Sequence, residues 1–216
     1  MKKIAIVLAG CGVFDGAEIH EAVLSMLAIQ KQGAEFQLFA PDIAQSHVIN
    51  HLSGEIMTEE RNVLIESARI ARGNIKALSM YNAAEFDALI FPGGFGVAKN
   101  LCNFAFKGSS MEVLPEVINS IQETHQMNKP IGAMCISPVI IAKLLPGTEL
   151  TIGNDVETSV LVEELGGKHK IANFTEVISD KKNKIFTTPC YMLQANLVQI
   201  AKGTENLISK VIEACI

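Results

Sequence analysis

The sequence predicts an α/β fold in which helices cover both faces of a mostly parallel β-sheet. Two observations carry this prediction. Short, β-branched apolar runs alternate along the chain with segments whose apolar residues recur at helical spacing, the order that produces parallel sheets. The first of these runs, residues 4–9, is apolar throughout, as is typical of a strand buried on both faces. With 216 residues, 49% of them hydrophobic, the chain is long enough for one well-packed domain over residues 1–216.

The first half of the chain contains three of the expected strands and two of the expected helices. A glycine follows each helical pattern, at Gly33 and Gly73, where helices commonly end. Turn residues follow the strands, with Pro-Asp at 41–42 after the second and Pro-Gly-Gly at 92–94 after the third. In order, these elements are a strand at 4–9, a helix at 19–32, a strand at 35–40, a helix at 59–72 and a strand at 87–91.

The second half continues the alternation and adds a hairpin. Two β-prone segments flank the polar turn 180–183, at the spacing of an antiparallel pair. Gly-Gly at 166–167 ends the helix before the hairpin, and Gly203 interrupts the closing helix. In order, these elements are a helix at 113–127, a strand at 128–134, helices at 138–144 and 157–165, strands at 177–179 and 184–187, and a helix at 193–214.

Charge and composition exclude several classes of function. The chain has 18 basic and 23 acidic residues and a net charge of −5, so we expect no nucleic-acid partner. Aromatic residues make up 6% of the chain and Trp is absent, which argues against a stacking platform for bases or sugars. No apolar run approaches the roughly 20 residues of a membrane-spanning helix, so no membrane partner is expected.

The cysteines are odd in number and scattered, without a Cys-x-x-Cys pair. This pattern indicates free thiols in a reducing compartment, and we expect a cytoplasmic location. No spacing of these residues suggests a metal centre. Residues 1–11 imitate a bacterial lipoprotein signal, but their apolar stretch is shorter than the roughly 7–15 residues of such a signal, which favours a buried strand. The cysteines are Cys11, Cys102, Cys135, Cys190 and Cys215.

Candidate functional residues follow the carboxyl ends of the predicted strands, where ligands bind in sheets of this kind. Cys135 lies where the strand ending at Met134 turns abruptly into a helix. A nucleophile at such a turn is held above the sheet, and the positive end of the helix lowers the pKa of its thiol. The alternative is a small buried apolar residue, the common fate of a free cysteine.

Two other strand ends carry groups that could assist Cys135. The glycine-rich turn 92–96 presents backbone N–H groups that can form an oxyanion hole with the N–H of Ile136; the alternative is a tight turn that merely needs glycine. Glu18 opens the helix after the first strand. It acts there either as a general acid/base beside Cys135 or as a carboxylate that stabilises the helix N-terminus.

Six segments together resemble one protein family. They are A-G-C-G-V-F-D-G-A-E-I-H-E-A at 9–22, V-I-N-H-L at 48–52, M-T-E-E-R-N-V-L-I-E at 57–66, P-G-G-F-G-V-A-K-N at 92–100, M-C-I at 134–136 and T-T-P-C-Y-M-L at 187–193. On these segments the chain is similar to the class I glutamine amidotransferase-like superfamily, which includes the PfpI-type proteins and the Parkinsonism-associated deglycase. It is more closely similar to the ElbB-type glyoxalases, also called enhancing lycopene biosynthesis proteins.

The resemblance implies a flavodoxin-like three-layer sandwich, a homodimer and a glutathione-independent glyoxalase without metal or cofactor. It implies that Cys135 adds to a small reactive aldehyde, glyoxal or methylglyoxal, and that Glu18 moves a proton between the two carbons to give glycolate. The N–H groups of Gly94 and Ile136 would hold the oxyanion. Two alternatives stay open, a deglycase that acts on glycated amines and a non-enzymatic, cysteine-based stress sensor or chaperone.

The chain also departs from the superfamily pattern, because no histidine follows Cys135 before His169. Asp155 lies in the neighbourhood where some members place a histidine, and is either a substitute partner or a surface residue. His20 follows Glu18 and, with Glu21, lines the same cleft or a solvated helix face. Cys11 is a resolving thiol or, as we favour, a packed side chain.

Overall fold

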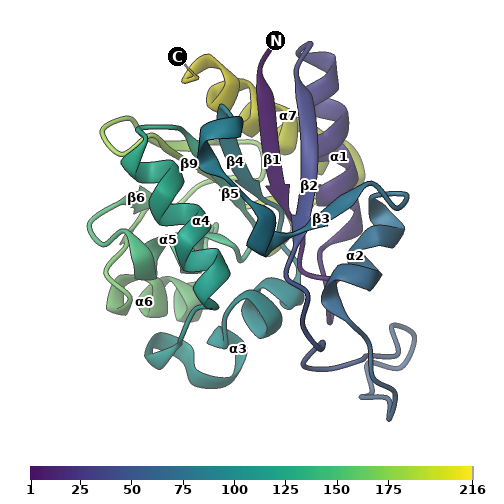
Figure 1. Cartoon of the computed structure of the whole chain (residues 1–216). Helices are drawn as coiled ribbons and strands as arrows, with labels where there is room; N and C mark the ends of the chain where they lie inside the picture. The colour runs from purple at the N-terminus through teal and green to yellow at the C-terminus, as the bar shows by residue number, and fades with distance from the viewer. Residues whose placement is uncertain (216) are drawn as a thin grey trace.

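The computed structural model describes residues 1–215 and has a seven-stranded sheet at its centre (Figure 1). The sheet is parallel except at one edge, where β8 pairs antiparallel with β9 as the predicted hairpin requires. The mostly parallel α/β architecture is therefore confirmed. In spatial order the strands are β3 (Ile75–Ala77), β2 (Glu35–Ala40), β1 (Lys3–Val7), β4 (Ala88–Phe91), β5 (Ile131–Met134), β9 (Ile185–Thr188) and β8 (Ile178–Asp180).

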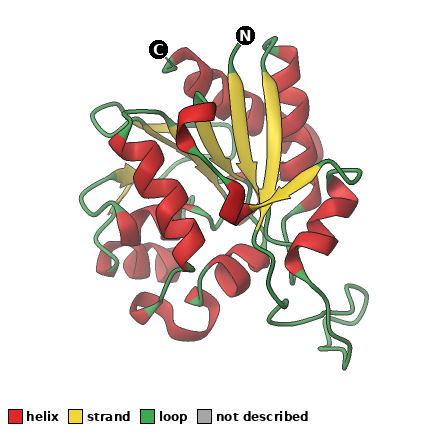
Figure 2. Ribbon diagram, viewed as in Figure 1, coloured by secondary structure: helices red, strands yellow, loops and turns green. Residues whose placement is uncertain are grey.

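Helices pack on both faces of the sheet and make three layers (Figure 2). The strand β1 shows why its sequence is apolar throughout. Ile4 and Ile6 pack into the core on one face, and Ala5 and Val7 pack into the core on the other. The first face carries α1 (Ile19–Lys31), α2 (Val63–Ile70) and α7 (Leu197–Glu213), and the second carries α4 (Pro115–Gln126), α5 (Pro138–Leu144) and α6 (Val156–Glu164).

The helices α2 and α7 each begin about four residues later than the sequence pattern predicts, because side-chain caps set their first turns. Asn62 caps α2 by accepting the N–H of Ile65, so residues 59–62 stay outside the helix. Asn196 and Gln199 form a reciprocal capping box at the start of α7. Several short elements were not predicted, namely β3, a π-helical turn at Val97–Leu101, α3 (Phe104–Lys107) and the two-stranded sheet of β6 (Glu149–Leu150) and β7 (Lys168–His169).

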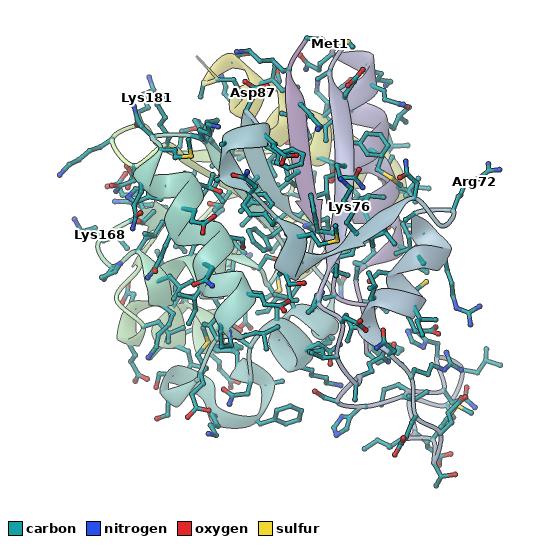
Figure 3. All side chains as sticks on the ribbon, in the orientation of Figure 1. Met1, Arg72, Lys76, Asp87, Lys168 and Lys181 are labelled. Atoms are coloured by element: carbon teal, nitrogen blue, oxygen red, sulfur yellow. The ribbon has the colours of Figure 1, made fainter. Side chains whose placement is uncertain are left out.

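The carboxyl ends of the parallel strands point to one edge of the molecule, the lower edge in Figure 1, where α3 also lies. Away from the carboxyl ends of the strands, charged side chains extend from the surface. Those of Lys168 and Lys181 extend outward on one side of the molecule and that of Arg72 on the other (Figure 3). No helix in residues 1–215 is long and apolar enough to cross a bilayer.

Candidate active site

Cys135 sits on the sharp strand-to-helix turn that the sequence predicts. Its φ of 58° is in the left-handed region, which a residue other than glycine adopts only when its surroundings hold it there. The backbone N–H of Cys135 donates to the carbonyl of Thr188 at 3.1 Å, and the hydroxyl of Ser137 donates to the carbonyl of Pro92 at 2.6 Å. These bonds tie the turn to the two neighbouring strand ends and aim the Cys135 side chain at the glycine turn after β4.

The carboxyl group that contacts the Cys135 sulfur belongs to Glu21, in the first turn of α1. Its side chain is fully buried and hydrogen-bonds the Cys135 side chain. One carboxyl oxygen, Oε2, accepts the N–H of Gly93 at 2.8 Å, and the other, Oε1, accepts the N–H of Tyr191 at 3.2 Å. The Glu21 carboxyl is thus fixed from two strand ends and is in place to exchange a proton with the sulfur.

Glu18 has a different place from the one that the family resemblance implies. It is the N-cap of α1, and its Oε2 accepts the N–H of Glu21 at 2.7 Å. Its backbone N–H donates to the carbonyl of Gly93 at 2.9 Å. Among the described residues, no hydrogen bond joins Glu18 to Cys135. The helix-capping alternative describes its geometry, and its carboxylate orients the turn that carries Glu21.

The glycine turn approaches the thiol so closely that only glycine fits. A Cβ at Gly93 would collide with the Cβ of Cys135 and would lie 2.6 Å from Oε2 of Glu21. The next residue, Gly94, has a φ of 100°, which L side chains rarely adopt. The N–H groups of Gly94 and Ile136 both hydrogen-bond the Cys135 sulfur. The two donors expected at an oxyanion therefore converge on the nucleophile itself.

Burial, rather than a helix end, has the largest effect on the pKa values of Cys135 and Glu21. Burial raises the pKa of Glu21 to about 8, and the nearby charge of Glu18 acts in the same direction. Burial also raises the pKa of Cys135 well above its ordinary value, and the charge of Glu21 adds to it, while the N–H groups of Gly94 and Ile136 lower it. The prediction that the helix end lowers the pKa of the Cys135 thiol is therefore wrong for the resting protein. Glu21 therefore ionises first, and the pair of groups then holds one proton between the thiol and the carboxylate.

The raised pKa of Glu21 predicts a pH-dependent stability. The unfolded chain loses this proton near the ordinary value of 4.5, and the folded protein loses it at about 8. Between these values the folded state binds more protons, so the free energy of unfolding falls as pH rises, by up to about 1.4 kcal/mol per pH unit. We expect Glu21→Gln to flatten the curve in this window. Urea unfolding of both proteins from pH 4.5 to 8 measures the difference; parallel curves would contradict the buried, proton-holding state.

The three accessory candidates lie around the pair rather than in it. Asp155 is exposed and caps α6, where the N–H of Thr158 donates to its Oδ1 at 2.8 Å and lowers its pKa. Cys11 is half-buried, and burial and then Glu66 raise the pKa of its thiol. Within residues 1–215, no hydrogen bond connects either of them to Cys135. Asp155 thus fits the alternative of a surface residue, and Cys11 fits the alternative of a packed side chain.

His20 links the rim of the site to the carboxylates. Its Nδ1 hydrogen-bonds the hydroxyl of Tyr191 at 2.9 Å and lies 3.8 Å from Oε1 of Glu18. Tyr191 in turn supplies the N–H that holds Glu21. Neither Glu21 nor Tyr191 was singled out as catalytic from the sequence. The available signal was the three-residue step from Glu18 to Glu21, which places both side chains in the same helical turn.

A cavity of about 320 Å³ opens beside the Cys135 side chain. It lies at the carboxyl ends of β4 and β5, where the sequence places the ligand site. Within residues 1–215, no cluster of three or more His, Cys, Asp or Glu side chains is arranged to hold a metal ion. Side chains on the cavity wall include Val13, Phe95, Phe104, Ile136, Tyr191 and Met192.

The sequence similarity to known proteins extends over almost the whole chain. No protein-family model matches it. The rat (Rattus norvegicus) mitochondrial ES1 protein homolog is 47% identical over 98% of this chain and 83% of its own length. The human (Homo sapiens) mitochondrial glutamine amidotransferase-like class 1 domain-containing protein 3 is also 47% identical, over 98% of this chain and 82% of its own.

These relatives overturn the expected cytoplasmic location. Both are mitochondrial proteins by name. The inference from the cysteines was wrong because free thiols indicate a reducing environment without specifying which compartment provides it. The five free cysteines of this chain are therefore no argument for the cytoplasm.

A solved structure shows the same fold at high similarity. The isoprenoid biosynthesis protein with an amidotransferase-like domain from Ehrlichia chaffeensis has a TM-score of 0.91 and 38% identity, and the match covers 98% of this chain and 99% of that one. The similarity thus extends over almost the whole fold of both proteins. This chain belongs to the ES1 family of class I glutamine amidotransferase-like proteins.

Proposed function

We propose that the protein is a cofactor-independent glyoxalase of the ElbB type, which converts glyoxal to glycolate through a hemithioacetal on Cys135. One observation carries the proposal: a buried thiol and a buried carboxyl group, Cys135 and Glu21, hydrogen-bond each other at the strand ends. A reaction that moves one proton between adjacent carbons needs a nucleophile and an acid/base group within reach of the same substrate. Glu21 therefore takes the role that the resemblance implies for Glu18.

The first step forms the bond between sulfur and substrate. With the shared proton on Glu21, the Cys135 thiolate adds to one aldehyde carbon, and the electrons of its C=O bond move to the oxygen. Glu21 gives its proton to that oxygen, which yields the hemithioacetal. The N–H groups of Gly94 and Ile136, which hydrogen-bond the sulfur, stabilise the thiolate before it reacts.

The second step moves hydrogen within the substrate. The Glu21 carboxylate removes the hydrogen of the sulfur-bearing carbon as a proton and returns it to the neighbouring carbon, while a proton passes from the first oxygen to the second. The first carbon is oxidised and the second reduced, so no outside oxidant is needed. Water then attacks the resulting thioester, the carbon–sulfur bond breaks, and glycolate leaves with the Cys135 thiol restored.

The direct test supplies purified protein with glyoxal in the absence of added thiol. The proposal expects one glycolate for each glyoxal consumed, at a rate proportional to protein concentration and unchanged by a chelator. Methylglyoxal in a parallel assay should give lactate by the same steps. Loss of glyoxal without glycolate would contradict the proposal and favour simple trapping of the aldehyde by protein amines.

We also propose the homodimer that the family resemblance implies. Ile19, Val23 and Leu27 recur at four-residue spacing on α1, and their side chains are 42%, 44% and 46% exposed. A second copy of this chain would cover this apolar face. Sedimentation equilibrium should give twice the 23.3 kDa of one chain, and Leu27→Glu should shift the mass toward 23.3 kDa. A wild-type mass of one chain at micromolar concentration would contradict the dimer.

A further inference from the structure

We propose that the preferred substrates of this site are 2-oxoaldehydes whose second carbon carries an apolar, aromatic-sized substituent. This inference rests on the proposed function and concerns the cavity beside Cys135. At about 320 Å³ the cavity is within the size range of pockets for small organic ligands, and the smallest dialdehyde would leave most of it to water. The space therefore fits a substituent much larger than a hydrogen or a methyl group.

The walls of the cavity are apolar on the sides away from the thiol. Phe95 and Phe104 supply aromatic surface, and Val13, Ile136 and Met192 supply aliphatic surface. These residues come from five separate places in the chain, so the apolar character is a property of the assembled cavity. An aromatic ring next to two phenylalanines gains both dispersion contacts and release of water.

Charged side chains do not line this cavity among the described residues. The polar side chains on its wall, apart from Cys135, are those of Thr158 and Tyr191. A phosphate or carboxylate on the substrate would lose its hydration there without a cationic partner. The lining thus disfavours acidic substrates, sugar phosphates among them, and favours neutral apolar ones.

The chemistry of the proposed function then proceeds without change. In the proposed binding mode the aldehyde carbon lies at the Cys135 sulfur, which borders both the cavity and Glu21, and the apolar substituent packs against Phe95 and Phe104. Hydrogen moves from the first carbon to the second, water hydrolyses the thioester, and the product is a 2-hydroxy acid. Each additional CH₂ group buried in the cavity raises the affinity of the bound state about fourfold.

The test compares phenylglyoxal with glyoxal in the wild-type protein and in two variants of α3. Phe104→Ser removes apolar surface from the cavity wall, and Phe106→Ser removes the same side chain from an exposed position two residues further on. We expect kcat/KM for phenylglyoxal to exceed that for glyoxal at least about tenfold. We expect Phe104→Ser to reduce this ratio at least about fivefold and Phe106→Ser to leave it unchanged. The wild-type ratio includes the difference in intrinsic reactivity between the two reagents. The change in this ratio from one protein to the next does not, because the same two reagents are compared in each, and that change therefore decides the inference.

The possible failures are distinguishable. If Cys135 turns over both compounds but Phe104→Ser leaves the ratio unchanged, the substrate inference is overturned and the glyoxalase stands. If neither compound is turned over, the proposed glyoxalase function is wrong. The preference of the cavity for aromatic groups is then tested by how strongly a ketone protects the Cys135 thiol from alkylation by iodoacetamide. Acetophenone should then slow alkylation at least about threefold in the wild type and not in Phe104→Ser, whereas acetone should have no effect. Equal protection by both ketones would overturn the inference.

Discussion

Cys135→Ala should abolish the conversion of glyoxal to glycolate, with a loss of at least about a thousandfold in kcat/KM. The reason is that every step of the proposed reaction passes through the bond between this sulfur and the substrate. The variant removes the nucleophile and leaves the turn of the backbone intact, since alanine keeps the Cβ. Stopped assays of glycolate with both proteins at equal concentration measure the loss.

Cys102→Ala is the matched control for this prediction. Cys102 is a second buried thiol, and burial raises its pKa to about 12. Its sulfur donates to the carbonyl of Val97, within the π-helical turn that follows the glycine-rich segment. Its hydrogen-bond partners in residues 1–215 are backbone groups rather than a carboxyl group, so we expect Cys102→Ala to keep most of the activity. Equal losses in both variants would indicate a general effect on folding and would contradict the assignment of Cys135.

Glu21→Gln should lower kcat by about a hundredfold to ten-thousandfold, while Glu18→Gln should lower it less than about tenfold. Glutamine at position 21 can still accept one of the N–H groups of Gly93 and Tyr191, but it cannot carry the migrating proton. Glutamine at position 18 can still cap α1 through its carbonyl oxygen. Parallel kcat measurements, with thermal unfolding to check folding, decide between the two carboxylates.

The pH profile gives an independent check on Glu21. The singly ionised Cys135–Glu21 pair is the reactive form, and the raised pKa of Glu21, about 8, predicts that it forms as pH rises through that value. We therefore expect kcat/KM of the wild type to increase up to about pH 8, and the residual activity of Glu21→Gln to need a higher pH. A larger loss in Glu18→Gln than in Glu21→Gln would restore Glu18 to the role that the family resemblance implies.

Much of the fold could be predicted because it depends on local patterns. The continuous apolar run of β1 appears in the sequence because both faces of that strand are buried. The hairpin of β8 and β9 follows from a polar turn between two short β-prone segments. Element ends were less predictable, since the start of α2 depends on a single hydrogen bond from Ile65 to Asn62. The edge strand β3 has three residues, which is too short for a periodic signal.

The sequence by itself determined that Cys135 ends a strand of a parallel sheet and that a glycine-rich turn ends its neighbour. Both statements depend only on the order of residues along the chain, because parallel strands bring their carboxyl ends together. Only the tertiary structure decided which carboxyl group meets the sulfur. Glu18 and Glu21 are in one helical turn, and the packing of α1 buries Glu21 against the strand ends while Glu18 caps the helix. The direction of the thiol pKa was likewise a tertiary property, because burial outweighs the N–H groups that the local turn supplies.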